Sequence, residues 1–154
     1  MNYQDENTRA VLKSGLQQLN RQQLKTFYSI LAHYWVTHKF FISRQNFFNL
    51  WCELNYLSAQ IDESFPEPYD DCELIKSFCQ AHPFYFIDIL SPDVVIELFC
   101  QYLDNQLDIL SSVVKRIHTG DLRTVYEYIN RALELSENID ELVEQTEGYI
   151  KAYP

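Results

Sequence analysis

The scarcity of glycine is the feature of this sequence that most restricts its fold. The chain of 154 residues contains three glycines, Gly15, Gly120 and Gly148. An all-β domain of this length needs many tight turns, and such turns commonly use glycine because its backbone adopts positive φ at little cost. Long helices joined by few loops need far fewer turns of this kind. We therefore predict an all-α fold.

The composition predicts that these helices form one domain with its own core. Apolar residues make up 47% of the chain and aromatic residues 15%, well above the content of a disordered chain. A chain of 154 residues is long enough to bury a core without disulfides or metals to hold it together. We predict a single helical domain over residues 1–154, a bundle of about six helices with a proline-containing acidic loop near residues 60–70.

Polar residues at capping positions indicate where the helices begin and end. Asn20 and Ser43 are suited to cap the helices that follow them. Ser91-Pro92-Asp93 combines a cap, a proline at the first helical position and an acid at the positive end of the helix dipole. Thr119-Gly120-Asp121 ends one helix and caps the next. With the spacing of the apolar residues, these signals predict helices over 5–19, 21–38, 44–59, 71–81, 84–90, 92–118 and 122–151.

Three segments in this assignment carry mixed signals. The 60–70 segment contains two prolines two residues apart, which preclude a regular helix and indicate a loop. The 84–90 segment has the β-branched and aromatic content of a strand, but no partner strand is evident, so we assign it to a helix. The last helix has a candidate break near Ser136.

Acidic residues are unevenly distributed along this chain, whose net charge is −10. Residues 1–59 carry six bases and three acids, whereas residues 60–154 carry six bases and nineteen acids. Two runs without an intervening base hold most of the excess. They are Asp62, Glu63, Glu67, Asp70, Asp71 and Glu73, and Glu134, Glu137, Asp140, Glu141, Glu144 and Glu147. Such surfaces repel the phosphates of nucleic acid and attract a basic protein, so we expect a protein partner and no direct nucleic-acid binding.

These two acidic runs supply the candidate binding site. In the first, aromatic residues lie among the acids, and aromatic anchors surrounded by charges are typical of protein interfaces. In the second, four glutamates are three, four and three residues apart, which predicts that they share the outer face of the last helix; glutamates on such a face are commonly only solvated. The candidate partner-binding residues are Asp62, Glu63, Phe65, Glu67, Tyr69, Asp70, Asp71, Glu134, Glu137, Asp140, Glu141 and Glu144.

Residues suited to catalysis or metal binding form no recognised pattern. The sequence has no glycine-rich phosphate loop, no GxSxG and no HExxH. Cys72, Cys79 and His82 could share a helical face and hold zinc, but CxxC spacing is absent. Cys79 and His82 could pair as nucleophile and base, but a third catalytic group is absent. His33 and His38 are five residues apart, which places them off any shared helical face. We expect no catalytic residue, no metal and no cofactor, and cysteines buried as small hydrophobes.

The sequence also gives an expectation about location. No window reaches the roughly 18 consecutive apolar residues of a membrane span. The first residues are acidic and polar, unlike the basic and then apolar start of a secretory signal. We expect a cytoplasmic protein with no membrane partner, whose four cysteines are reduced.

Together these features favour a non-enzymatic acidic binding protein that neutralises a basic partner protein. Immunity proteins and antitoxins that block a nuclease toxin, and phage inhibitors that mimic nucleic-acid charge, are examples of the class. A regulatory adaptor for a transcription factor or secretion substrate is one alternative, and an exposed groove lined by Phe40, Phe41 and Trp35 would favour it. An enzyme of unrecognised type is the other, which a deep pocket with converging polar groups would favour.

Overall fold

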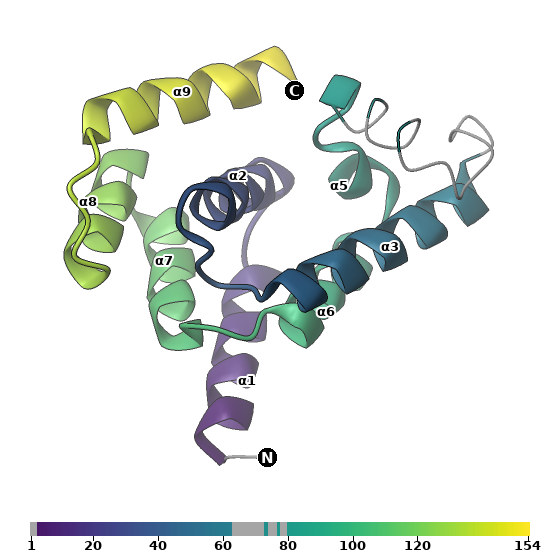
Figure 1. Cartoon of the computed structure of the whole chain (residues 1–154), viewed down its shortest axis with the longest axis horizontal. Helices are drawn as coiled ribbons and strands as arrows, with labels where there is room; N and C mark the ends of the chain where they lie inside the picture. The colour runs from purple at the N-terminus through teal and green to yellow at the C-terminus, as the bar shows by residue number, and fades with distance from the viewer. Residues whose placement is uncertain (1–2, 63–72, 74–76, 78–79) are drawn as a thin grey trace.

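The computed structural model describes residues 3–62, 73, 77 and 80–154, and these residues form eight helices and no strand (Figure 1). The predicted all-α fold is therefore confirmed. The helices are α1 (Tyr3–Gln17), α2 (Arg21–His38), α3 (Arg44–Ile61), α5 (Tyr85–Ile89), α6 (Pro92–Tyr102), α7 (Leu107–Thr119), α8 (Leu122–Ala132) and α9 (Ile139–Ala152).

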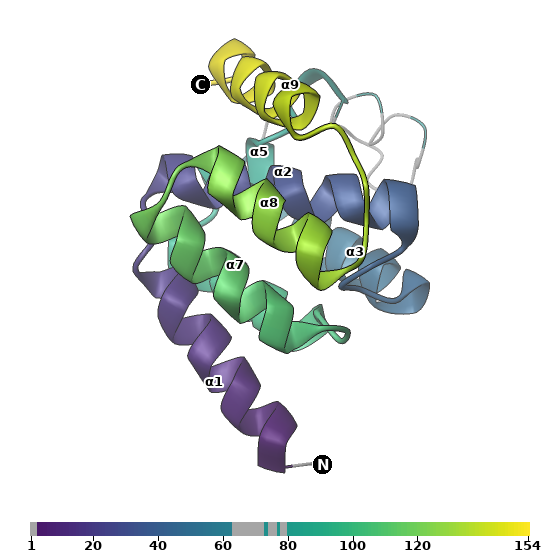
Figure 2. The same ribbon diagram turned by 90° about the vertical axis from the view of Figure 1, so that its left-hand side faces the viewer.

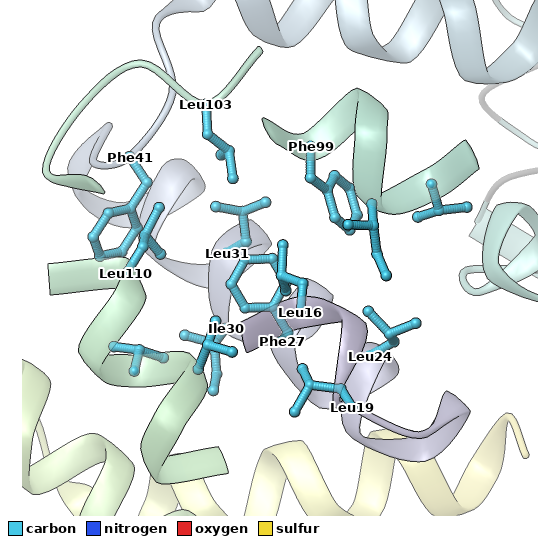
Figure 3. Packing of buried hydrophobic residues seen from close by; sticks show 14 of the residues in the cluster. Leu16, Leu19, Leu24, Phe27, Ile30, Leu31, Phe41, Phe99, Leu103 and Leu110 are labelled. Atoms are coloured by element: carbon cyan, nitrogen blue, oxygen red, sulfur yellow. The ribbon is translucent and has the colours of Figure 1, made fainter. Parts of the chain in front are cut away.

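Helix α2 lies at the centre of the bundle and supplies the middle of the core. Its buried side chains follow the helical period and include Phe27, Ile30 and Tyr34, each fully inaccessible to solvent. Figure 3 shows Phe27 and Ile30 among leucines of the neighbouring elements, with Phe99 of α6 close by. The ring centroids of Phe27 and Phe99 are 5.7 Å apart. This single apolar cluster extends into all of the helices, which agrees with one shared core.

The remaining helices pack around α2 and against one another. Helix α1 packs against α7 and α6, and α3 packs against α6 and α5. Gly15 allows α1 to approach α7 closely, because a Cβ there would lie 2.9 Å from Cγ1 of Val114. Helices α7, α8 and α9 follow one another in contact, and Figure 2 shows α9 at one end of the molecule with α1 at the other.

The predicted helix starts are confirmed by local hydrogen bonds. Asn20 and Gln23 form a reciprocal capping box at α2. The side chains of Ser43, Ser91 and Asp121 each accept a hydrogen bond from the backbone N–H three residues later. The 84–90 segment is also helical, as predicted, with most of its apolar side chains buried.

The predicted continuous helix over 92–118 is wrong, because the chain breaks between α6 and α7. Leu103 is extended, and Gln106 has a left-handed backbone with φ of 55°. The backbone N–H groups of Asp104 and Asn105 both donate to the carbonyl oxygen of Phe41, at 3.2 Å. A partner about 60 residues away in the sequence thus satisfies amide groups that a continuous helix would use internally.

The predicted last helix is divided in the same way. Helix α8 ends at Ala132 and α9 begins at Ile139, so the break near Ser136 is confirmed. The number of helices exceeds the predicted six chiefly because of these two breaks. Residues 60 and 61 belong to α3, and the rest of the predicted acidic loop beyond Asp62 and most of the predicted 71–81 helix lie outside the described residues.

Replacing Gln106 with glycine tests the break between α6 and α7. A left-handed backbone costs a residue with a side chain roughly 1–2 kcal/mol, whereas the extra freedom of glycine in the unfolded chain costs roughly 0.4–1 kcal/mol. We expect Gln106→Gly to raise the free energy of unfolding by about 0.5–1 kcal/mol, measured by urea denaturation. The control Gln106→Ala keeps the strain and should be less stable than Gln106→Gly. If Gln106→Ala were more stable than Gln106→Gly, the result would indicate a continuous helix at this position, because alanine is favoured over glycine within a helix.

Candidate protein-interaction surface

The outer face of α9 carries a row of carboxylates. Asp140, Glu144 and Glu147 are four and three residues apart, so they project from one side of the helix, with Glu141 beside them. All four residues are exposed. The opposite side of α9 is buried through Leu142, Thr146 and Ile150. Burial of this second stripe fixes the rotation of α9 and therefore directs the acidic stripe to solvent.

Among the described residues, most of these carboxylates have no lysine or arginine partner. Asp140 pairs with Arg123 of α8. Glu141 accepts a hydrogen bond from Nε2 of Gln145 at 3.1 Å. Within the described part of the chain, no lysine or arginine forms an ion pair with Glu141, Glu144 or Glu147.

The lysines and arginines of residues 1–59 that form ion pairs in the described structure do so with acids away from α9. The Lys13 ammonium lies 2.5 Å from a carboxylate oxygen of Glu97, and that of Lys25 lies 3.1 Å from Asp88. These acids belong to α6 and α5, on other parts of the molecule. These two lysines therefore do not neutralise the carboxylates of α9.

The acidic surface extends from α9 onto α8. From Asp121 to the end of α9, the exposed charged residues are seven acids and three bases. They are Asp121, Glu127, Glu134, Asp140, Glu141, Glu144 and Glu147, with Arg123, Arg131 and Lys151. We call this set the α8–α9 acidic surface.

The prediction that Glu134, Glu137, Glu141 and Glu144 share one helical face is wrong. Glu134 lies in the turn after α8 with a φ of 56°, and Glu137 lies in the linker before α9. Because the helix is interrupted at Leu133, the spacing of three and four residues does not place Glu134 and Glu137 on the same helical face as Glu141 and Glu144. Glu134 is exposed, but the side chain of Glu137 is only 21% exposed and points toward α2.

Glu137 instead joins the α8–α9 linker to α2 through two histidines. Its carboxylate oxygens lie 3.2 Å from Nε2 of His33 and 3.0 Å from Nε2 of His38. Although five residues separate these histidines, both reach the same carboxylate, because the His38 ring contacts one oxygen of Glu137 and the His33 ring lies closest to the other. The side-chain amide of Asn130 donates to the backbone carbonyl of Glu137 at 3.1 Å. This cluster fixes the linker, and thereby the start of α9, against α2.

Opposing effects act on the pKa of Glu137. Burial disfavours the charged carboxylate and raises its pKa, but hydrogen bonds from His38 and His33, and their charge when protonated, favour the carboxylate. The histidines outweigh burial, so the pKa of Glu137 lies below its ordinary value. The phenol of the neighbouring Tyr34 is affected in the other direction, because burial raises its pKa well above its usual range.

The first acidic run lies almost wholly outside the described residues. Asp62 follows the end of α3, and its carboxylate accepts a hydrogen bond from the hydroxyl of Tyr85 at 2.5 Å. The remaining candidates of this run lie outside the described residues: Glu63, Phe65, Glu67, Tyr69, Asp70 and Asp71. Their assignment to a partner-binding site stays a prediction.

The cysteines and histidines form no metal site within residues 3–62, 73, 77 and 80–154, where no group of three or more potential ligand side chains is arranged to hold an ion. Burial raises the pKa of the Cys100 thiol to about 11, which disfavours the reactive thiolate. Cys72 and Cys79 lie outside the described residues.

The aromatic groove expected of an adaptor is not formed by the three residues named for it. Phe41 is fully buried, and Phe40 is half-buried. Trp35 stacks on Phe47 with ring centroids 3.9 Å apart, and the Lys39 ammonium lies 4.3 Å from the Trp35 ring. These rings therefore contribute to packing between α2 and α3.

Two features of the site escaped the sequence analysis. Glu147 is in the second acidic run but outside the candidate residues, although its spacing from Asp140 and Glu144 places it on their face. A shorter final helix beginning near Ile139 would have revealed this face. The contact of His33 and His38 with Glu137 had no sequence signal, because it joins residues about 100 positions apart.

Comparison with known proteins assigns this chain to no family, because no family model, curated protein or solved structure matches it. Among the described residues, no helix has the length and apolar character needed to cross a lipid bilayer. The class of protein is therefore defined by the all-helical fold and its acidic surface.

Replacing Glu137 with glutamine tests the link between the linker and α2. Glutamine keeps the shape and one acceptor oxygen but loses the charge, so we expect the free energy of unfolding at pH 7 to fall by about 1–2 kcal/mol. Because the pKa of Glu137 is lowered, its stabilising effect is present above the unfolded value of 4.5 and is lost as the pH falls through the folded value.

The stability difference between wild type and Glu137→Gln should therefore shrink between about pH 5 and pH 3, measured by urea denaturation at each pH. The control Glu134→Gln removes an exposed charge three residues away and should have a smaller effect at every pH. A difference for Glu137→Gln that stays constant down to pH 3 would contradict the assigned role of its charge.

Proposed function

We propose that this protein is a non-enzymatic acidic binding protein whose α8–α9 acidic surface docks on a basic surface of another protein. The observation that carries the proposal is the row of exposed carboxylates on α9 without ion pairs to lysine or arginine. Glu141, Glu144 and Glu147 are the members of this row that form no such pair with a described residue. A cationic partner would supply positive charges that pair with these carboxylates.

Repulsion between the carboxylates of α9 favours a role in partner binding over a helix surface that is only solvated. Like charges three and four residues apart on a helix repel one another and slightly destabilise it. The same charges attract and orient a basic partner, which raises the rate of association. Since the Debye length at physiological salt is about 8 Å, neighbouring carboxylates on α9 act together on an approaching surface.

The spacing of the carboxylates gives α9 a lower density of charge along its axis than a strand of duplex DNA has. Charges three and four residues apart recur about every 4.5–6 Å along a helix axis. One strand of duplex DNA carries a phosphate about every 3.4 Å. The α9 row is thus less dense in charge than a nucleic-acid strand, although both would attract the phosphate-binding surface of a nuclease. In that setting the protein would act as an inhibitor of the immunity or antitoxin type.

An adaptor is the second candidate function, and it would use another surface. Helix α3 exposes 56% of Phe48 and 52% of Tyr56, and its charged residues are only Arg44 and Glu53. Exposed aromatic side chains on a helix with few charges suit an apolar partner. This candidate predicts binding that depends on Phe48 and is insensitive to salt.

Binding of a flexible basic peptide tests the acidic surface directly. The probe is a 20-residue peptide of alternating arginine and serine, labelled for fluorescence anisotropy. We expect the triple variant Glu141→Gln, Glu144→Gln, Glu147→Gln to weaken binding about tenfold at 50 mM NaCl, because three exposed attractions are lost. We also expect wild-type binding to weaken strongly between 50 and 300 mM NaCl.

The matched control neutralises the same number of exposed carboxylates on other parts of the molecule, as Glu6→Gln, Asp93→Asn, Glu97→Gln. This variant has the same net charge as the α9 triple variant and should bind the peptide nearly as tightly as wild type does. Equal losses in the two variants would show that only net charge matters, and the proposed surface would then be rejected.

A further inference from the structure

A shallow groove runs between α2 and α9 beside the acidic surface. Its volume is about 380 Å³, and its lining is mostly apolar. Side chains that line it include Ala32, Val36, Thr37, Leu142, Gln145 and Tyr149. Val36 is 64% exposed and Tyr149 is 42% exposed, so the groove leaves two large apolar side chains open to solvent.

A carboxylate lies at the edge of the groove on the α9 side. Gln145 lines the groove and donates a hydrogen bond to Glu141, which holds that carboxylate beside the α9 wall. His33 lines the opposite wall and is bonded to Glu137. From Ser29 to Thr37 the α2 wall contains no lysine, arginine, aspartate or glutamate. An occupant therefore meets a mostly apolar floor with the Glu141 carboxylate at its edge.

We propose that this groove docks a short amphipathic helix of the basic partner, with apolar side chains on Val36 and Tyr149 and with lysine or arginine beside Glu141. The inference rests on the proposed function and specifies how the partner is recognised. An apolar groove between two helices suits a third helix, since its side chains enter the space between the helical ridges. Charge complementarity selects a cationic helix over a neutral or acidic one.

The length of the groove limits the length of the docked helix. On α2 the lining extends from Ser29 to Thr37, which is about 12 Å along the helix axis. On α9 it extends from Leu142 to Tyr149, which is about 10 Å. Two to three turns of the partner helix would fill this length, with apolar residues at i, i+3, i+4 and i+7.

The test compares two peptides of identical composition. One is an 18-residue peptide with leucine at i, i+3, i+4 and i+7 and lysine or arginine at most other positions, and the other has the same residues in scrambled order. The groove variant is Ala32→Gln, Val36→Gln, which occupies the groove without changing the charge. The matched control is Phe48→Gln, which removes another exposed apolar side chain from α3.

We expect wild type to bind the amphipathic peptide at least about tenfold more tightly than the scrambled one, measured by fluorescence anisotropy. The groove variant should lose this preference and bind both peptides equally, whereas Phe48→Gln should keep it. Circular dichroism and the unfolding midpoint of each variant confirm that it is folded. Equal binding of the two peptides by wild type, or a preference that survives in the groove variant, would overturn the docking proposal.

The α9 triple variant separates this inference from the proposed function. If it weakens binding of both peptides while the groove variant has no effect, the acidic surface stands and the groove proposal is rejected. If it leaves both affinities unchanged while the groove variant removes the preference, docking of apolar side chains in the groove stands, but the pairing of the docked helix with Glu141 and the acidic function are both rejected. Concentration-dependent dimers of wild type that the groove variant abolishes, seen by sedimentation, would assign the groove to a second copy of this chain and overturn the proposal.

Discussion

Burial of the apolar side of α2 determines where the other helices lie. Phe27, Ile30 and Tyr34 are fully buried, and a large apolar side chain gains roughly 1.5–3 kcal/mol when it is removed from water. This gain requires contributions from several neighbouring helices at once, including the contact of the Phe99 ring of α6 with the Phe27 ring. The edge of α2 around Val36 is left outside this packing, and α9 lies beside that edge.

The carboxylates of the C-terminal region divide into two groups with different physical consequences. Glu137 is held between His33 and His38, so its charge contributes to the position of the linker. The carboxylates of α9 point the other way, because the opposite stripe of that helix is buried. The α8–α9 linker thus carries a carboxylate that two histidines satisfy. The helix that follows it exposes carboxylates that a cationic partner can satisfy. This division explains why only part of the acidic run is available for binding.

The sequence predicted the helices better than it predicted their interruptions. The starts of α2, α3, α6 and α8 were correct because each depends on a cap that bonds to an amide three residues away. The break between α6 and α7 was missed because the carbonyl of Phe41 satisfies the amides of Asp104 and Asn105 from a distant loop. The placement of Glu134 and Glu137 on one helical face failed for a related reason, since it assumed a helix that ends at Ala132.

The sequence alone determined the all-helical class, the helix starts and the excess of acid in the C-terminal region. These follow from composition and from interactions over a few residues, which act before the chain is folded. Only the tertiary structure decided which carboxylates are exposed, because that depends on which stripe of α9 is buried. It also decided that His33 and His38 meet Glu137 and that a groove lies between α2 and α9. Contacts between residues about 100 positions apart leave no periodic pattern in a single sequence, so they are determined only when the core packs.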